Sequence, residues 1–203
     1  MTLVDFDHYS LATSDSRYGT SYNNGSNKAA MTFIASTIPA SSQTIYAASV
    51  SRPYSYLMSS LRTYLNNTIL TSLPFSTDLI PTVTIGYYGS NYSSGQSTSH
   101  SDYVNRTTTE QIFSAGAVEL GEKYNTTLAK VQTKFAYYTA GNSIIFTAPN
   151  GTVPRYIYTR DIDYGDSSNA YVRYLYWNDE HDVSGTWSSS VGCSGNYTFI
   201  FNL

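Results

Sequence analysis

The C-terminal stretch Asn196-Tyr197-Thr198-Phe199-Ile200-Phe201-Asn202-Leu203 gives the clearest structural signal in this 203-residue chain. Tyr197, Phe199, Phe201 and Leu203 alternate with Asn196, Thr198, Ile200 and Asn202. Because successive side chains of a β-strand point to opposite faces of the sheet, this period of two indicates a half-buried strand. We expect the odd-numbered side chains to face a core and the even-numbered side chains to face outward.

Similar β-like runs recur along the chain, separated by Gly, Pro and Asn turn signals. They span residues 29–37, 44–50, 82–88, 129–137, 143–148, 155–160 and 171–177. Residues 38–42 are few enough to join the first two runs as a hairpin. Short strands with frequent turns are typical of two packed antiparallel sheets. The pattern predicts an all-β single domain over 1–203, an antiparallel β-sandwich or jelly roll of about 8–10 strands.

One segment has the period of a helix instead. Its apolar positions, at helical spacing, are Tyr54, Leu57, Met58, Leu61, Leu65 and Ile69. Ser51, followed by Arg52 and Pro53, has the features of an N-cap before an early-turn proline. The spacing predicts one helix near 52–70, and the alternative is a strand pair that turns at Asn66-Asn67-Thr68.

The charge balance excludes several classes of protein. Charged residues make up only 12% of the chain, and 11 Lys+Arg stand against 14 Asp+Glu for a net charge of -3. Nucleic-acid binding calls for a basic patch, and a membrane helix for about 20 apolar residues. We therefore expect no nucleic-acid partner and no membrane span. The 21 tyrosines combine an apolar ring with a hydroxyl, which suits subunit interfaces and sugar-binding platforms.

Seven Asn-x-Ser/Thr sequons point to an exterior compartment. They lie at Asn24, Asn66, Asn91, Asn105, Asn125, Asn150 and Asn196. We expect glycosylation at these asparagines; the alternative is that a Ser/Thr/Asn-rich chain generates sequons by chance. Residues 1–7 have neither the basic nor the apolar region of a secretion signal. The signal was removed, or the protein leaves the cell by another route, such as inside a virion.

Two clusters have the composition of metal sites. Asp161, Asp163 and Asp166 surround an expected turn, and oxygen-rich turns bind calcium. The EF-hand spacing and its closing Glu are missing, so a solvated turn is favoured. A zinc site from His8, His100 and His181 has no support in their spacing.

Catalytic motifs are absent from the sequence. His181 lies among carboxylates in residues 178–182, but without a second motif an acidic loop is favoured. There is no nucleophile elbow and no P-loop. We therefore expect a non-enzymatic protein with no catalytic residues, no cofactor and no bound metal. Cys193, the single cysteine, rules out an intramolecular disulfide and is favoured as a buried thiol over a bond between chains.

In composition the whole chain resembles exported surface proteins and virion proteins of thermoacidophilic archaea, among them glycosylated thread-like or pilus-like filament subunits. The resemblance implies a β-sandwich completed by a strand from a neighbouring copy. It makes residues 1–12 an N-terminal assembly (donor) strand and copies of the same chain the partners. Low charge also suits an acidic exterior, where carboxylates are protonated.

The stretch 169–177, together with Asn196-Tyr197-Thr198-Phe199, is similar to the C-terminal strands of adenovirus fibre heads. That likeness covers under a fifth of the chain and implies a virion attachment protein. Residues 89–101, rich in Gly, Ser and Tyr, would then form an exposed receptor-binding loop.

These features predict a structural or adhesive subunit of an extracellular filament, glycosylated and self-associating through strand pairing. One alternative is a virion capsid, spike or fibre-head protein for host attachment. A second is a carbohydrate-binding module that binds host or cell-surface glycans. The expected location is the cell-surface filament or the virion surface.

Overall fold

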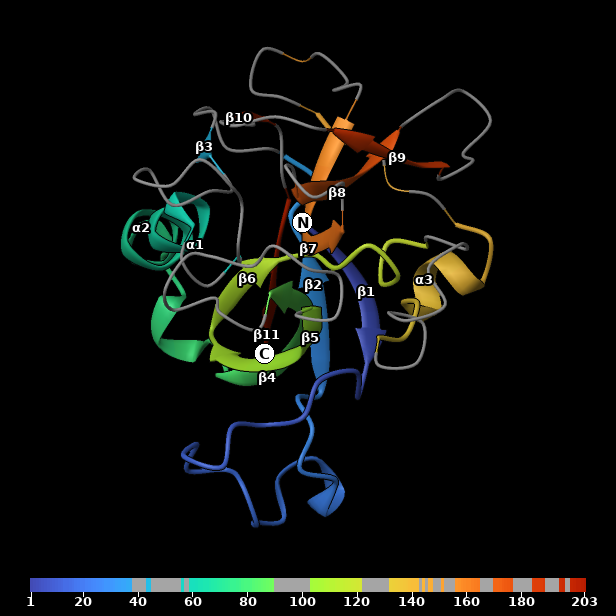
Figure 1. The fold of residues 1–203 in the computed structure, drawn as a ribbon. Coiled ribbons are helices and arrows are strands. Elements are labelled where there is room, and N and C mark those ends of the chain that lie inside the picture. The colour runs from blue at the N-terminus through green and yellow to red at the C-terminus, as the bar shows by residue number, and fades with distance from the viewer. Residues whose placement is uncertain are drawn as a thin grey trace.

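The computed structural model describes residues 1–37, 43–44, 56, 59–89, 103–121, 132–142, 144, 146–147, 151, 156–164, 170–176, 184–188, 194–195 and 198–203. Within these residues the fold is rich in strands, and neighbouring strands in the named sheets are antiparallel (Figure 1). The predicted strand-rich, antiparallel character is confirmed. In the same ranges, no helix combines the length and apolar character that a membrane crossing requires.

A four-stranded sheet contains both ends of the chain. Its order is β1 (Thr2–Phe6), β2 (Met31–Ile34), β11 (Phe199–Asn202) and β6 (Ile112–Ser114). The first and last strands thus lie on either side of β2. Reciprocal backbone hydrogen bonds of 3.1 Å between Met31 and Leu203 extend the pairing to the last residue.

The last strand, β11, is buried on both faces. Phe201 packs against Phe33 and Phe75, with ring centroids 5.5 and 5.4 Å apart. On the other face, Asn202 Nδ2 donates to Thr82 Oγ1 at 2.9 Å, and Ile200 and Asn202 have no exposed surface. The expectation that the even-numbered side chains face outward is therefore wrong. β11 is an inner strand, and the segment around Thr82 covers its second face.

Three smaller sheets complete the described strands. In one sheet β4 (Thr82–Gly89) pairs with β5 (Tyr103–Glu110). In the second sheet β8 (Ala170–Tyr176) lies between β7 (Tyr156–Tyr164) and β9 (Ser184–Ser188). In the third sheet β10 (Ser194–Gly195) pairs with β3 (Gln43–Thr44). The run predicted at 82–88 is confirmed as part of β4, and the described parts of the runs at 155–160 and 171–177 are confirmed in β7 and β8. The sequence did not predict β5.

The hairpin predicted from residues 29–37 and 44–50 is wrong in its pairing. β2 pairs with β1 and β11, whereas β3 pairs with β10. Residues 38–42 and 45–50 lie outside the described residues. In the run predicted at 143–148, Ile144 and Phe146 are buried, and the described part makes only the Thr37–Thr147 bridge.

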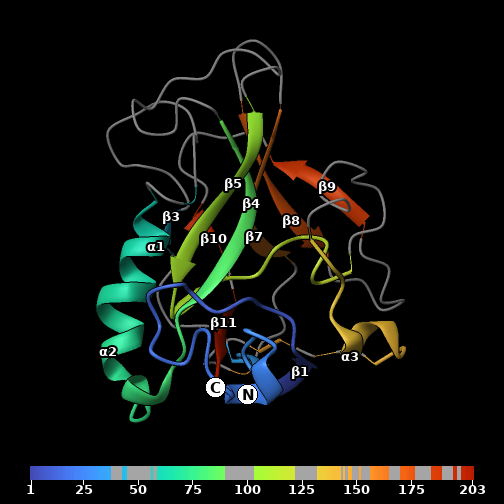
Figure 2. The ribbon, with the colours of Figure 1, turned by 90° about the horizontal axis from the view of Figure 1, so that it is seen from below.

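The predicted helix is present from Ser60 to Ser72, where α1 (Ser60–Tyr64), a π-helical turn η3 (Leu65–Ile69) and α2 (Leu70–Ser72) are continuous. It runs alongside the β4–β5 pair (Figure 2). Ser59 is its N-cap and accepts a hydrogen bond from the Arg62 N–H at 3.0 Å, so this helix begins eight residues after the predicted start. Residues 51–55, 57 and 58 lie outside the described residues. The alternative turn at 66–68 is wrong, because these residues lie inside the helix. A short 3-10 turn, η4 (Ser76–Asp78), follows.

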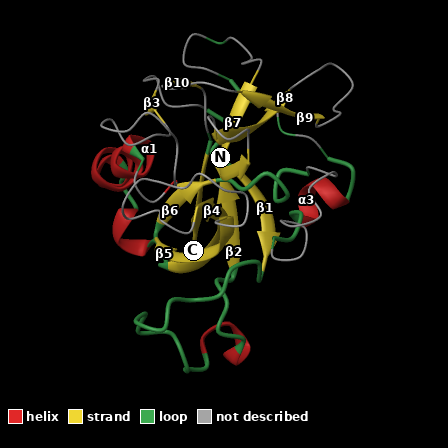
Figure 3. Cartoon of the chain, viewed as in Figure 1, coloured by secondary structure: helices red, strands yellow, loops and turns green. Residues whose placement is uncertain are grey.

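The strand predicted at 129–137 is wrong over its described part, 132–137. Residues 132–135 pair with no strand, and Ala136–Thr139 form the one-turn helix α3 (Figure 3). The Ala136 N–H donates to Asp5 Oδ2 at 3.1 Å, which caps this turn from β1. Phe135 and Tyr138, three residues apart, enter the core together. Packing and a distant cap thus outweigh the local period of two.

A long loop, residues 7–30, projects from the four-stranded sheet (Figure 1). It contains η1 (Tyr22–Gly25), in which Asn23 and Asn24 adopt left-handed backbone angles with φ of 46° and 56°. Asn27 Oδ1 accepts from the Gly19 N–H at 2.7 Å, and the Tyr22 hydroxyl accepts from the Ala30 N–H at 3.1 Å. These bonds hold the loop in a defined shape.

Candidate functional site

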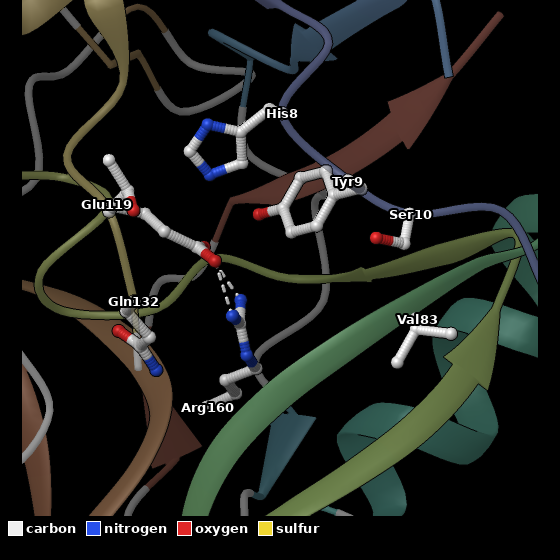
Figure 4. A pocket seen from close by; sticks show the side chains of 8 residues that line it. His8, Tyr9, Ser10, Val83, Glu119, Gln132 and Arg160 are labelled. Carbon is white, nitrogen blue, oxygen red and sulfur yellow. Dashed lines mark hydrogen bonds and ion pairs between the residues drawn. The ribbon is translucent and has the colours of Figure 1, made fainter. Parts of the chain in front are cut away.

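A polar cavity of about 150 Å³ lies where the segment after β1 meets β4 and β7 (Figure 4). Its inner wall is formed by His8, Tyr9, Glu119, Gln132 and Arg160. Ser10, Val83 and Thr133 complete the lining, and Ser10 and Thr133 are exposed to solvent. Backbone hydrogen bonds hold the segment that contains Tyr9 and Ser10 in place. The Val83 N–H donates to Ser10 O at 2.8 Å, and the Ala29 N–H donates to Tyr9 O at 3.0 Å.

A buried ion pair between Arg160 and Glu119 lines the cavity. The guanidinium bonds both carboxylate oxygens, through Nη2 to Oε1 and through Nη1 to Oε2 at 2.7 Å. Arg160 has no exposed surface and Glu119 has 2%. Burial raises the pKa of Glu119, but the Arg160 charge and hydrogen bonds outweigh it and lower that pKa below its ordinary value. The same pairing outweighs burial at Arg160 and raises its pKa further.

Asp161 and Gln132 are buried beside the ion pair and are hydrogen-bonded to each other. Asp161 Oδ2 accepts from the Ala117 N–H at 2.7 Å, and its Oδ1 accepts from Gln132 Nε2 at 2.8 Å. Burial raises the pKa of Asp161 in spite of the neighbouring Arg160 charge. Gly116 leaves room for this arrangement, because a Cβ there would lie 2.6 Å from Gln132 Oε1.

Tyr9 and His8 form the wall opposite the ion pair. The Tyr9 hydroxyl points toward the Glu119 side chain (Figure 4) but makes no hydrogen bond within the described part of the chain. Burial first, and then the Glu119 charge, raise the pKa of Tyr9 well above its ordinary value, so the hydroxyl keeps its proton. His8 Nδ1 lies 2.7 Å from Asp5 Oδ2, which fixes the ring.

Aromatic packing holds this wall in place. The Tyr9 ring lies edge-on to Phe113 at 5.0 Å, and the His8 ring lies 4.5 Å from Phe135. The Arg160 guanidinium lies over the Phe113 ring, 5.6 Å from its centroid. The rings therefore connect the N-terminal segment to the ion pair.

The carboxylate of the described lining is already paired. Glu119, the one carboxylate in the lining, is held by Arg160 and by the Gly116 N–H at 2.8 Å, so it is a poor proton donor or acceptor. Among the described residues, no three of the His, Cys, Asp and Glu side chains group as a metal site would require. The cavity offers hydrogen-bonding groups around a preformed space.

The solvated turn favoured at Asp161, Asp163 and Asp166 is wrong in its described part. Asp161 and Asp163 lie on β7, and Asp161 has no exposed surface. Its oxygens are already bonded to Ala117 and Gln132, so it is neither in a solvated turn nor available to a cation. Asp166 lies outside the described residues.

The structure describes few of the other predicted site residues. His100, His181, the 178–182 loop, the 90–101 part of the receptor loop and Cys193 lie outside the described residues, as do the sequons at Asn91, Asn125, Asn150 and Asn196. Asn105 lies on β5. Asn24 is exposed in η1, whereas Asn66 lies in the helix and donates from Nδ2 to Glu110 Oε2 at 3.2 Å.

No motif in the sequence predicted the residues that form the cavity. Glu119 follows Ala115-Gly116-Ala117-Val118, and Arg160 follows Tyr156-Ile157-Tyr158-Thr159. In a chain with only 12% charged residues, a charge at the end of an uncharged run is a signal for a buried, paired group. That signal identifies each residue but not its partner, 41 positions away.

No protein-family model, no curated protein and no solved structure matches this chain. The resemblances to archaeal surface filaments, virion proteins and fibre heads therefore stay predictions.

Proposed function

We propose that this protein is a glycosylated structural subunit of an extracellular assembly and that copies associate through the N-terminal strand. The observation that carries this proposal is the position of β1 at the edge of the four-stranded sheet. Among the described residues no strand pairs with its outer edge, although the short helix α3 lies beside it (Figure 1). Open sheet edges are templates for pairing with another chain.

The opposite edge of the sheet is closed. At β6, the Ser114 N–H donates to the Tyr56 hydroxyl at 3.2 Å, and Arg160 Nη1 donates to Ser114 O at 2.9 Å. The Arg160 N–H also bonds Ala115 O at 2.9 Å. With β6 blocked, a strand that adds to this sheet joins at β1.

Side chains near β1 favour the same surface. Met1 is 66% exposed and Phe6 is 62% exposed, and both are large and apolar. Apolar groups on a free edge are a liability in a monomer and an advantage at an interface. Residues 1–12 remain the proposed assembly strand, either paired edge to edge or donated to the neighbouring sheet.

We also propose that the separate sheets form two layers of a β-sandwich or jelly roll of about 8–10 strands. Supporting this, β4 contributes to covering the four-stranded sheet, through the bond from Asn202 to Thr82. In such a fold the open edge of β1 is a natural place for assembly.

The assembly test is the oligomeric state of the full chain at rising concentration, measured by sedimentation velocity and negative-stain electron microscopy. We expect the native protein to form oligomers or filaments and Phe6→Lys to stay monomeric, because a charge on the edge opposes strand pairing. Tyr18→Lys is the matched control: Tyr18 is 43% exposed but lies on the loop, so this variant should still assemble. A native protein that stays monomeric at every concentration would refute the proposal.

A further inference from the structure

The cavity beside β1 has a buried hydrogen-bond donor that points into it. The Tyr9 residue is 5% exposed, and its hydroxyl faces the Glu119–Arg160 pair without coming within hydrogen-bond distance of a partner in the described chain. A buried hydroxyl without a partner is unfavourable by about 1–3 kcal/mol relative to a bonded one. Such a group, at the wall of a cavity with a solvent-exposed rim, is suited to meet a ligand.

His8 supplies a complementary acceptor. A carboxylate can only accept, so the proton between His8 Nδ1 and Asp5 Oδ2 belongs to the imidazole. In the neutral ring Nε2 is then an acceptor. The His8 ring turns toward the same space as the Tyr9 hydroxyl (Figure 4), with ring centroids 4.6 Å apart. A ligand hydroxyl can accept from Tyr9 and donate to His8 with one oxygen atom.

The charges around the cavity select against ions. Arg160 is already paired with Glu119, so it does not act as an anion site. A ligand anion would meet the Glu119 carboxylate, and a ligand cation would meet the Arg160 guanidinium. The favoured ligand is therefore neutral.

We propose that this cavity binds one neutral, hydroxylated six-membered ring, that is, a monosaccharide unit. A cavity of about 150 Å³ is large enough for a six-membered ring. Ser10 and Thr133, whose side chains carry hydroxyls, are exposed at the rim of the cavity, where the rest of a glycan would extend into solvent. This site goes beyond the proposed assembly and does not depend on it.

The experiment is a ligand-observed NMR titration of the full chain with the methyl α-pyranosides of glucose, mannose and galactose. Tetrahydropyran, the same ring without hydroxyls, is the control ligand. We expect at least one glycoside to bind and tetrahydropyran not to bind. Tyr9→Phe removes only the hydroxyl and should weaken binding about fivefold, whereas Tyr18→Phe, on the loop, should leave it unchanged.

A second pair of variants tests the cavity without changing Tyr9. Ser10→Trp fills the rim from an exposed position and should abolish binding, while Ser21→Trp on the loop should not. Circular dichroism checks that each variant is folded. The proposal is overturned if no glycoside binds at about 10 mM, which leaves the cavity to ordered water alone. Binding that survives Ser10→Trp overturns it as well.

Discussion

Arg160 has a guanidinium with no contact with solvent, and Glu119 is its bidentate partner. Removing two charges from water is unfavourable by several kcal/mol per ion, and their attraction offsets this only with good geometry. Arg160 also bonds Ser114 O at 2.9 Å, so the pair ties β7 to the end of β6.

Breaking the pair should therefore be far worse than replacing it. We expect Glu119→Leu alone to lower the free energy of unfolding by about 3–5 kcal/mol, since it leaves a buried guanidinium without its carboxylate. The double variant Glu119→Leu/Arg160→Met should recover most of that loss. Urea unfolding followed by circular dichroism measures both.

The two single variants and the double variant form a double-mutant cycle, and one outcome of that cycle would contradict the pairing. If the losses from Glu119→Leu and Arg160→Met simply add, the two side chains are not coupled. That outcome would contradict the pairing described for the cavity wall.

At the level of elements, the place of a sequon decides whether it can receive a glycan. Asn24 lies exposed in a turn with a left-handed backbone. Asn66 lies in a helix, and its Nδ2, the atom that a glycan would modify, donates to Arg62 O at 3.0 Å and to the buried Glu110. Of the five other sequons, Asn105 lies on β5, and the remaining four lie outside the described residues.

We expect glycan on Asn24 and none on Asn66 in the native protein. Glycosylation at Asn66 would break both hydrogen bonds and force a bulky sugar against Glu110, which is 4% exposed. Peptide mass spectrometry of protein from its native source measures the occupancy of each site. A bare Asn24 in a protein glycosylated elsewhere would contradict this expectation, and bare asparagines throughout would undercut the extracellular proposal.

Some elements could be predicted from local pattern and others could not. Leu61, Leu65 and Ile69 repeat at helical spacing, and their helix is present. Residues 132–137 alternate like a strand, but the Asp5 carboxylate and the packing of Phe135 place a helical turn there. No local pattern contains a cap that comes from more than a hundred residues away.

At the scale of the whole molecule, stability in acid depends on the buried carboxylates. The folded-state pKa of Glu119 is lowered from 4.5, so its stabilising effect is complete above that pH and is lost as the pH falls through the folded value. The pKa of Asp161 is shifted in the opposite direction. Its pKa is raised from 3.8, so its ionisation destabilises the fold as the pH rises through the folded value.

We expect the stability difference between the native protein and Glu119→Gln to be constant near neutral pH and to shrink below pH 4.5. The groups around Glu119 are Arg160, His8, Tyr9 and Asp161, and the Arg160 charge is the strongest influence that favours ionisation. Urea unfolding of both proteins at a series of pH values measures the difference. A gap that grows toward acid would contradict the lowered pKa of Glu119.

Local periodicity in the sequence was enough to predict antiparallel strands and the helix that spans Ser60–Ser72. The C-terminal stretch 196–203 indicated a strand at once, and β11 is that strand. The tertiary structure alone decided that β11 is covered on both faces, that residues 136–139 form a helical turn, and that Tyr9, Glu119 and Arg160 meet at one cavity. Each of these depends on contacts between residues far apart in the chain, and neither the period of a segment nor its composition contains them.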